Sequence, residues 1–151
     1  MAPSPPNSTL FSGEFCHALD GKHRLTIPAA WRATGADEFF MLPDSNNTCL
    51  RVMPPDQFRA VADKVAVVPG VSAQEQRAFL RQFYSRAQRV VADKQGRLVV
   101  PEEYCQRFKL QNEIMLVGTH DTFEVWNCDS WKATQQTETP TYARVAGLLG
   151  I

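Results

Sequence analysis

Two short stretches of this chain place an aspartate, a lysine and an arginine within five residues of one another. Residues 20–24 read Asp-Gly-Lys-His-Arg, and residues 93–97 read Asp-Lys-Gln-Gly-Arg. Aspartate at such a point accepts backbone N–H bonds and fixes the shape of a turn. A turn tip that carries arginine and lysine fits the major groove of DNA, where arginine pairs with guanine and lysine contacts phosphate or guanine. These residues therefore favour recognition of double-stranded DNA.

The residues that we assign to this candidate site fall into two groups. The cations that we expect to contact DNA are Lys22, Arg24, Lys94 and Arg97. The residues that we expect to shape the turns are Asp20, Asp93 and Gly96. Gly96 stands at a turn position where glycine most readily supplies a positive φ, and His23 occupies the same position in the first stretch.

A plainer interpretation is that the aspartate and arginine of each stretch form an internal ion pair that only stabilises the turn. Exposed ion pairs of this kind are common and contribute little to stability. For a single turn this interpretation is the better one. Two equivalent cationic tips, however, suit a ligand that itself repeats, so the residues alone leave the two interpretations about equal.

Catalysis and metal binding find no support in the residue pattern. Asp20 and Asp93 each stand beside cations that keep the carboxylate ionised, and no nucleophile accompanies them, so we expect no catalytic residue and no enzyme. The histidines and cysteines lack the spacing of metal ligands, which predicts no metal site and no cofactor. We expect the cysteines to be reduced thiols packed in the protein. The histidines are His17, His23 and His120, and the cysteines are Cys16, Cys49, Cys105 and Cys128.

The two stretches belong to a longer internal repeat. Asp20 and Asp93 are 73 residues apart, and the same offset aligns residues 25–28 with 98–101 and Trp31 with Tyr104. A run of matches at one offset indicates a tandem duplication. Each copy has fewer than about 50 residues, too few to bury an adequate core alone, so the two copies are expected to share one.

Periodicity predicts a β-β-α-β-β pattern in each copy. A strand over 11–19 and an extended run at 25–27 precede a short helix that starts at Pro28, and two further strands follow. Asp56 is expected to cap the next helix, residues 72–75 form a capping box that opens another, and Asn127 is a third candidate cap. The predicted organisation is an N-terminal extension 1–9 without structure, a first repeat 10–56, connecting helices 57–86, a second repeat 87–132 and a tail 133–151.

Composition indicates a soluble globular protein. Of the 151 residues, 44% are hydrophobic, and no apolar run is long enough for a membrane span, so no membrane partner is expected. Residues 1–9 have neither the basic start nor the apolar stretch of a secretory signal, which favours the cytoplasm.

The formal net charge is zero. Because cations gather between 77 and 97, one face can still be positive. The aromatic residues expected in the core are Trp31, Phe79, Phe83, Tyr84 and Trp126.

The sequence resembles the MraZ family, bacterial transcriptional regulators with two tandem AbrB/SpoVT-type domains. The resemblance rests on Phe-Ser-Gly-Glu at 11–14, on residues 19–28, on Asp-x-x-Gly-Arg-Leu at 93–98, and on the two segments 115–118 and 123–126. It covers roughly residues 10–132. The doubled Asp-x-x-x-Arg in this setting is specific to the family.

The resemblance implies an α+β, β-rich fold, a swapped-hairpin barrel that two repeats build together. It also implies a ring-shaped homo-oligomer, which binds repeated DNA elements upstream of the division and cell-wall gene cluster and associates with the nucleoid. By motif position, Lys22, Arg24 and Arg97 are the DNA contacts, and Lys94 is added from its place in the turn. The family usually has glycine at position 23 and a basic residue at position 12, where this chain has His23 and Ser12.

The main alternative is an antitoxin-like or oligomeric protein-interaction module of the same fold. Its ligand would be a protein rather than DNA. Neutralisation of phosphates makes DNA binding strongly dependent on salt, which separates the two hypotheses.

Overall fold

The computed structural model describes residues 10–32, 35 and 37–151. The expectation of an unstructured extension at 1–9 concerns residues outside this part of the chain. The elements follow one another as β1 (Glu14–Ala18), β2 (Arg24–Thr26), η1 (Ala29–Trp31), β3 (Glu38–Pro43), β4 (Leu50–Met53), α1 (Pro55–Val67), α2 (Ala73–Arg86), β5 (Gln88–Val91), β6 (Arg97–Val99), α3 (Glu102–Arg107), β7 (Glu113–Gly118), β8 (Phe123–Asn127) and α4 (Cys128–Leu149).

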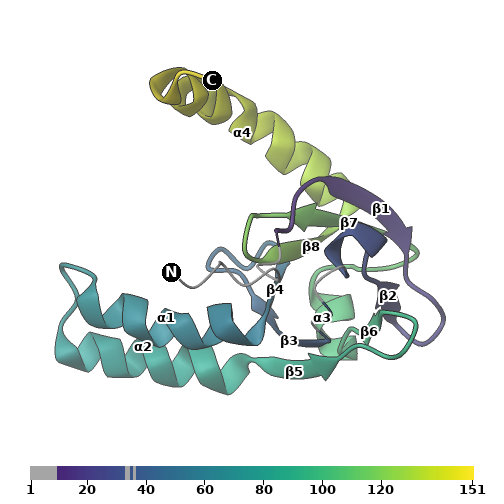
Figure 1. Cartoon of the computed structure of the whole chain (residues 1–151), viewed down its shortest axis with the longest axis horizontal. Coiled ribbons are helices and arrows are strands. Elements are labelled where there is room, and N and C mark those ends of the chain that lie inside the picture. The colour runs from purple at the N-terminus through teal and green to yellow at the C-terminus, as the bar shows by residue number, and fades with distance from the viewer. Residues whose placement is uncertain (1–9, 33–34, 36) are drawn as a thin grey trace, which may run out of the picture.

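One antiparallel sheet contains strands of both repeats, and they are interleaved. The six-stranded sheet has the order β1-β7-β8-β4-β3-β5, and β2 and β6 form a separate two-stranded ribbon (Figure 1). β1 of the first repeat pairs with β7 of the second, and β5 of the second pairs with β3 of the first. Each repeat therefore gives its first strand to the other. This arrangement confirms the α+β, strand-rich, swapped-hairpin fold that the family resemblance implies.

An approximate two-fold axis relates the two repeats. In the ribbon Leu25 pairs with Leu98, and in the sheet Arg51 pairs with Glu124. In both pairs the partners are 73 residues apart, which is the offset of the sequence repeat. A residue that pairs with its own equivalent must lie on the symmetry axis, so the axis passes through both pairs.

Both repeats contribute to the main hydrophobic core, as their small size requires. Trp31, at the end of η1, is only 2% exposed and lies near the middle of this core. Its ring centroid is 5.4 Å from that of Phe11 and 5.0 Å from that of Phe123, and its indole N–H donates to the Ser12 carbonyl at 3.0 Å. Phe123 comes from the second repeat, so one side chain of the first repeat ties the two together.

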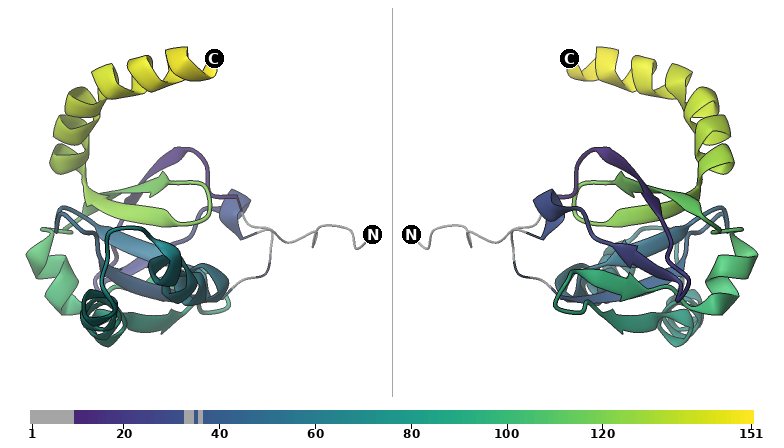
Figure 2. Two further views of the ribbon diagram at one scale, coloured as in Figure 1. Left: turned by 90° about the vertical axis from the view of Figure 1, so that its left-hand side faces the viewer. Right: turned by 90° about the vertical axis from the view of Figure 1, so that its right-hand side faces the viewer.

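The helices α1 and α2 form a hairpin that projects from one end of the sheet (Figure 1; Figure 2). Ser72 caps α2 in a capping box with Glu75, as predicted. The Phe58 ring of α1 stacks on Phe40 of β3 at a centroid distance of 4.1 Å, and the Tyr84 hydroxyl of α2 donates to the Phe58 carbonyl at 2.7 Å. These contacts fix the base of the hairpin to the sheet.

Two local predictions are wrong and one is only partly right. Asp56 does not cap α1, because the helix begins at Pro55 and Asp56 lies in its first turn. Proline suits a first helical position, which needs no N–H donor. A short helix follows Pro28 as predicted, but it is the 3₁₀ helix η1 rather than an α-helix. Phe79 is not a core residue, because it is 41% exposed, and Phe83 and Tyr84 of the same helix are only half-buried.

The helix α4 follows β8 without a loop. The Asn127 side chain accepts hydrogen bonds from the N–H groups of Asp129 and Ser130, so the predicted cap is confirmed. The first turns of α4 lie against β7 and β8, and the indole N–H of Trp131 donates to the Glu14 carboxylate of β1 at 3.0 Å. The base of α4 is thus bound to the edge strand of the sheet.

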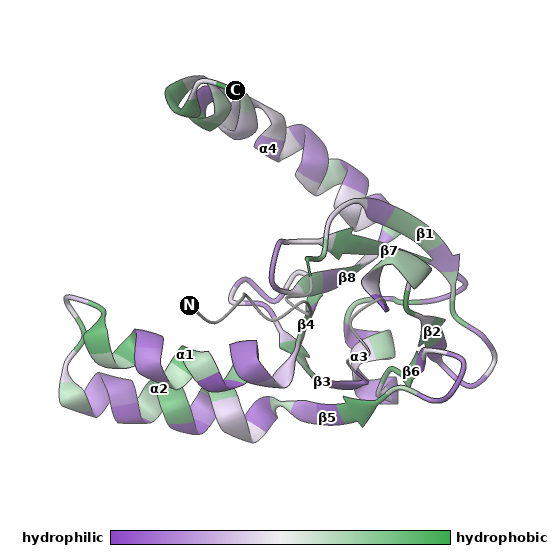
Figure 3. Ribbon diagram, viewed as in Figure 1, coloured by the Kyte–Doolittle hydropathy of each residue, from purple (hydrophilic) through white to green (hydrophobic). Residues whose placement is uncertain are grey.

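The rest of α4 extends away from the sheet, and its last turns are apolar (Figure 3). Tyr142, Leu148 and Leu149 are each at least 69% exposed. The sequence predicted no element for residues 133–151, because Pro140 interrupts the pattern and no buried face imposes a helical period. Among the residues that the structure describes, no helix combines the length and the apolar character needed to cross a membrane.

Candidate nucleic-acid interface

The first turn, residues 20–24, is built around the Asp20 carboxylate. One carboxylate oxygen accepts the backbone N–H groups of Lys22 and Arg24, both at 2.9 Å. The other accepts Nε–H of the Arg24 side chain at 2.6 Å. The backbone N–H of His23 donates to the Asp20 carbonyl at 3.0 Å and closes the turn. A single side chain thus fixes both the backbone and the arginine.

The second turn, residues 93–97, repeats this arrangement. The Asp93 carboxylate accepts the backbone N–H groups of Gln95 at 2.9 Å and Arg97 at 3.0 Å, and it accepts Nε–H of Arg97 at 2.7 Å. The Gly96 N–H donates to the Asp93 carbonyl at 2.9 Å. In both turns the bond to the aspartate comes from Nε, so the Nη groups of the arginine remain to donate elsewhere.

The backbone at the tip of each turn is left-handed. Gly96 has φ of 76° and His23 has φ of 60°. Glycine adopts such a φ without strain, whereas a residue with a Cβ does so at a cost. The sequence comparison of these two positions predicted the positive φ correctly.

The aspartates remain charged at neutral pH. Hydrogen bonds from the Arg24 backbone and side chain and from the Lys22 backbone lower the pKa of Asp20 to about 2. The pKa of Asp93 is lowered as well, first by the backbone N–H of Arg97. Each aspartate therefore balances the charge of its own arginine.

The lysines are the open cations of the two turns. Lys22 and Lys94 are both exposed, and within residues 10–32, 35 and 37–151 neither forms a salt bridge. A lysine without a carboxylate partner keeps its charge for a ligand. The net positive charge of each tip therefore comes from its lysine.

The β2/β6 ribbon holds the two turns at its opposite ends. The Ile27 N–H donates to the Gly96 carbonyl and the Val100 N–H donates to the His23 carbonyl, both at 2.8 Å. Each tip is thus bonded to the strand that follows the other tip. The two bonds lie four residues apart along the ribbon, which is roughly 13 Å at 3.3 Å per residue. The ribbon and the α1/α2 hairpin lie at opposite ends of the molecule (Figure 1; Figure 2).

A further cation, Arg32, lies against the second turn. Its Nη1 donates to the Gln95 carbonyl at 3.1 Å. A Cβ built on Gly96 would be only 2.5 Å from Cδ of Arg32, so the absence of a side chain at Gly96 lets the arginine lie across the turn. Sequence reasoning missed Arg32, because the contact joins segments 63 residues apart.

The position equivalent to Arg32 beside the first turn does not hold an arginine. The residue 73 positions after Arg32 is Cys105, which is 6% exposed. A shallow pocket beside the first turn is lined by His23, Cys105 and the acidic residue Glu102. The second turn is therefore the more positive of the two.

The run of cations between residues 77 and 97 does not form one face. Arg77 and Arg81 belong to α2, which extends away from the ribbon (Figure 1). Arg89 pairs with Glu38 at 2.6 Å. Only Lys94 and Arg97 of this run belong to the second turn.

The cysteines differ from the expectation of packed thiols. Cys49 and Cys105 are buried, and burial raises the pKa of both thiols. Cys16, in contrast, is exposed, and Cys128 is half-buried. The expectation was wrong for Cys16, because β1 is the edge strand and one of its faces is exposed.

Comparison with known proteins places these features in a family. Two successive segments, residues 10–82 and 83–147, match the family described as "MraZ protein, putative antitoxin-like". The chain is 36% identical to the transcriptional regulator MraZ of Pediococcus pentosaceus over 130 residues, which cover 85% of this chain and 90% of that protein. The protein of the same name from Lactiplantibacillus plantarum is 36% identical over 134 residues, 89% of this chain and 92% of the relative. That from Symbiobacterium thermophilum is 35% identical over 138 residues, 91% and 99% of the two chains. This chain belongs to the MraZ family.

Proposed function

We propose that this protein is a sequence-specific regulator of transcription that binds double-stranded DNA through its two turns. The observation that carries the proposal is the duplicated turn, in which an arginine held by an aspartate recurs beside an exposed lysine at each end of one ribbon. The name that the relatives share, transcriptional regulator, supports the same class of function.

The spacing of the turns suits one groove of a DNA duplex. Along the ribbon the tips are roughly 13 Å apart, close to the width of about 12 Å of the major groove. Lys22 and Lys94 would contact phosphates, while the Nη groups of Arg24 and Arg97 donate to guanine O6 and N7. The aspartates hold both guanidinium groups in place beforehand, so less conformational entropy is lost on binding.

Arg32 adds to the second turn. It carries a positive charge next to Lys94 and is already oriented by its bond to the Gln95 carbonyl. The second turn would therefore bind DNA more tightly than the first. Because the two tips differ in affinity, the protein would bind a repeated element preferentially in one orientation. The reverse orientation would exchange the stronger and the weaker contacts.

The proposed target follows from the family resemblance. It consists of repeated elements upstream of the division and cell-wall gene cluster, which places the protein in the cytoplasm in association with the nucleoid. We propose no enzyme activity and no cofactor for this function.

A ring-shaped homo-oligomer is part of the proposal. Apolar side chains are exposed on the α1/α2 hairpin, such as Val67 and Phe79, and at the end of α4, such as Leu148 and Leu149. Burial of these surfaces between subunits would favour association. Several turns that act on repeated sites would gain from a high effective concentration, which compensates for the zero net charge of one subunit.

Selection of bound duplexes from a random pool tests this proposal. The proposal expects a repeated element with guanines at fixed positions. Arg97→Ala should relax the preference for one guanine, with a loss of about 1–3 kcal/mol in binding. Enrichment of no common element would contradict sequence-specific binding.

The second candidate is a protein-interaction module related to antitoxins. The exposed apolar residues of α4 and the zero net charge favour it. Such a module would bind random duplex DNA weakly and with little dependence on salt, whereas a DNA-binding protein loses affinity steeply as salt rises.

A further inference from the structure

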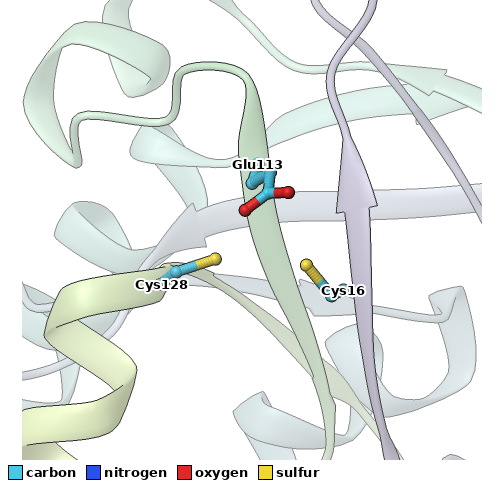
Figure 4. A group of neighbouring side chains, drawn as sticks. All are labelled: Cys16, Glu113 and Cys128. Carbon is cyan, nitrogen blue, oxygen red and sulfur yellow. The ribbon is translucent and has the colours of Figure 1, made fainter.

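Three side chains with metal-binding atoms meet on the outer face of the sheet, away from the two turns. They are Cys16 of β1, Glu113 of β7 and Cys128, the first residue of α4. The two sulfur atoms and a carboxylate oxygen all lie within 4.8 Å of one another. Figure 4 shows the two thiols turned toward each other, with the carboxylate beside them.

The fold brings these residues together although Cys16 and Cys128 are 112 positions apart. β1 pairs with β7 through the exchange of strands between the repeats, which puts Ala18 opposite Glu113 and Cys16 opposite Met115. β8 pairs with β7 on the other side, with Asn127 opposite Ile114, so the next residue, Cys128, emerges at the same end of the sheet. Neither repeat alone contains all three side chains.

The set of donor atoms is that of a zinc site. Zn²⁺ takes thiolate sulfur at about 2.3 Å and carboxylate oxygen at about 2.0–2.2 Å in a tetrahedral arrangement. Two sulfur atoms at that bond length are about 3.8 Å apart. The three atoms, within 4.8 Å of one another, therefore need to move by no more than about 1 Å.

Solvent access and the local charge also favour the binding of a cation at this cluster. Cys16 and Glu113 are exposed and Cys128 is half-buried, so an ion can enter from solvent. Three groups that carry negative charge when ionised lie together here. A divalent cation offsets this repulsion, and thiols release protons when they bind it.

We propose that Cys16, Glu113 and Cys128 form a binding site for a thiophilic divalent cation of the Zn²⁺ class. Water completes the tetrahedron at the fourth position. The bound ion joins β1, β7 and the base of α4, beside the hydrogen bond from Trp131 to Glu14. Metal binding would therefore fix the direction in which α4 leaves the sheet.

Titration of the fully reduced chain with Co²⁺, followed by displacement with Zn²⁺, tests the site. We expect one Co²⁺ per chain, with the visible bands of tetrahedral Co²⁺ and a thiolate-to-cobalt charge-transfer band that Zn²⁺ abolishes. Cys16→Ser and Cys128→Ser should each lose the charge-transfer intensity, and Glu113→Gln should weaken binding roughly 10-fold or more.

Glu14→Gln is the matched control, because it removes a carboxylate from the same strand and the same face without touching the cluster. This variant should bind Co²⁺ as the wild type does. Cys49 and Cys105 remain in every variant, so binding by them would persist in Cys16→Ser. Persistence of the charge-transfer band in Cys16→Ser or Cys128→Ser would overturn the proposal. So would a reduced wild type that takes up no metal and only forms a Cys16–Cys128 disulfide on oxidation.

A second readout does not depend on colour. Zn²⁺ should raise the Tm of the wild type and of Glu14→Gln but not that of Cys16→Ser, because a ligand stabilises only the protein that binds it. Equal shifts in all three proteins would assign the stabilisation to a different site and would contradict the proposal.

Discussion

At the scale of single residues, one carboxylate stabilises each turn. Asp20 and Asp93 accept two backbone N–H groups and one arginine Nε–H apiece. The ion pair that looked like an alternative to DNA binding is present in both turns. It orients the arginine but takes only Nε, so the stabilising role and the proposed binding role are compatible.

The pKa of Asp20 leads to a prediction about pH. A carboxyl whose pKa falls from 3.8 to about 2 on folding stabilises the protein above pH 3.8, and this stabilisation disappears as the pH falls through about 2. Asp20→Asn should therefore have a lower Tm than the wild type at pH 7, and the difference should fade between about pH 4 and pH 2. Thermal unfolding of both proteins across this range checks it. A difference that is constant with pH would show that the charge of Asp20 has no part in stability.

The left-handed tips give a second prediction. Gly96→Ala should destabilise the protein by about 1–3 kcal/mol, because φ of 76° is strained for any residue with a Cβ and because Arg32 must move. His23→Gly should change the stability by no more than about 1 kcal/mol, since relief of strain is offset by a more flexible unfolded chain. Unfolding by urea measures both. Equal effects of the two changes would contradict this account of the tips.

At the scale of elements, the contact between Arg32, the residue after η1, and the second turn makes the two repeats unequal. Arg32→Ala removes a cation that lies against the second turn, and it should weaken DNA binding while the Tm changes little. Arg77→Ala, on α2 at the other end of the molecule, is the control and should bind as the wild type does. Fluorescence anisotropy with a labelled duplex measures both affinities. An unchanged affinity for Arg32→Ala would confine the interface to the turns themselves.

The helix α4 supplies a prediction about assembly. The double change Leu148→Asp and Leu149→Asp places charges on an exposed apolar surface and should reduce the size of the oligomer without loss of helix or of Tm. Glu138→Gln, on the same helix, should leave the size unchanged. Sedimentation velocity at micromolar concentration distinguishes the outcomes. If the wild type is itself a monomer, the proposed ring is wrong.

At the scale of the whole molecule, the repeat explains what could be predicted from the sequence. The offset of 73 residues predicted the shared core and the positive φ at His23 and Gly96, because equivalent residues occupy equivalent positions about the two-fold axis. The α+β, swapped-hairpin fold was implied by the resemblance to the MraZ family. Contacts between segments that no pattern links could not be predicted. Arg32 on the second turn and Cys16 beside Cys128 depend on how the strands are exchanged. Within the part of the chain that the structure describes, the end of α4 is exposed, so its sequence shows no pattern of burial.

The central claim is that the two turns carry the DNA contacts. The measurement that tests it most directly is the salt dependence of binding for the double variant Lys22→Ala and Lys94→Ala. Each phosphate contact that is lost should reduce the slope of log affinity against log salt by about 1, so this variant should lose about 2 per bound subunit.

Lys64→Ala with Lys132→Ala is the matched control, because it removes the same charge from exposed positions on α1 and α4. For this control we predict the same slope of log affinity against log salt as for the wild type. For the double variant of the turns we predict a smaller slope at an unchanged Tm. Equal slopes for both double variants would show that the turns do not contact DNA and would contradict the account.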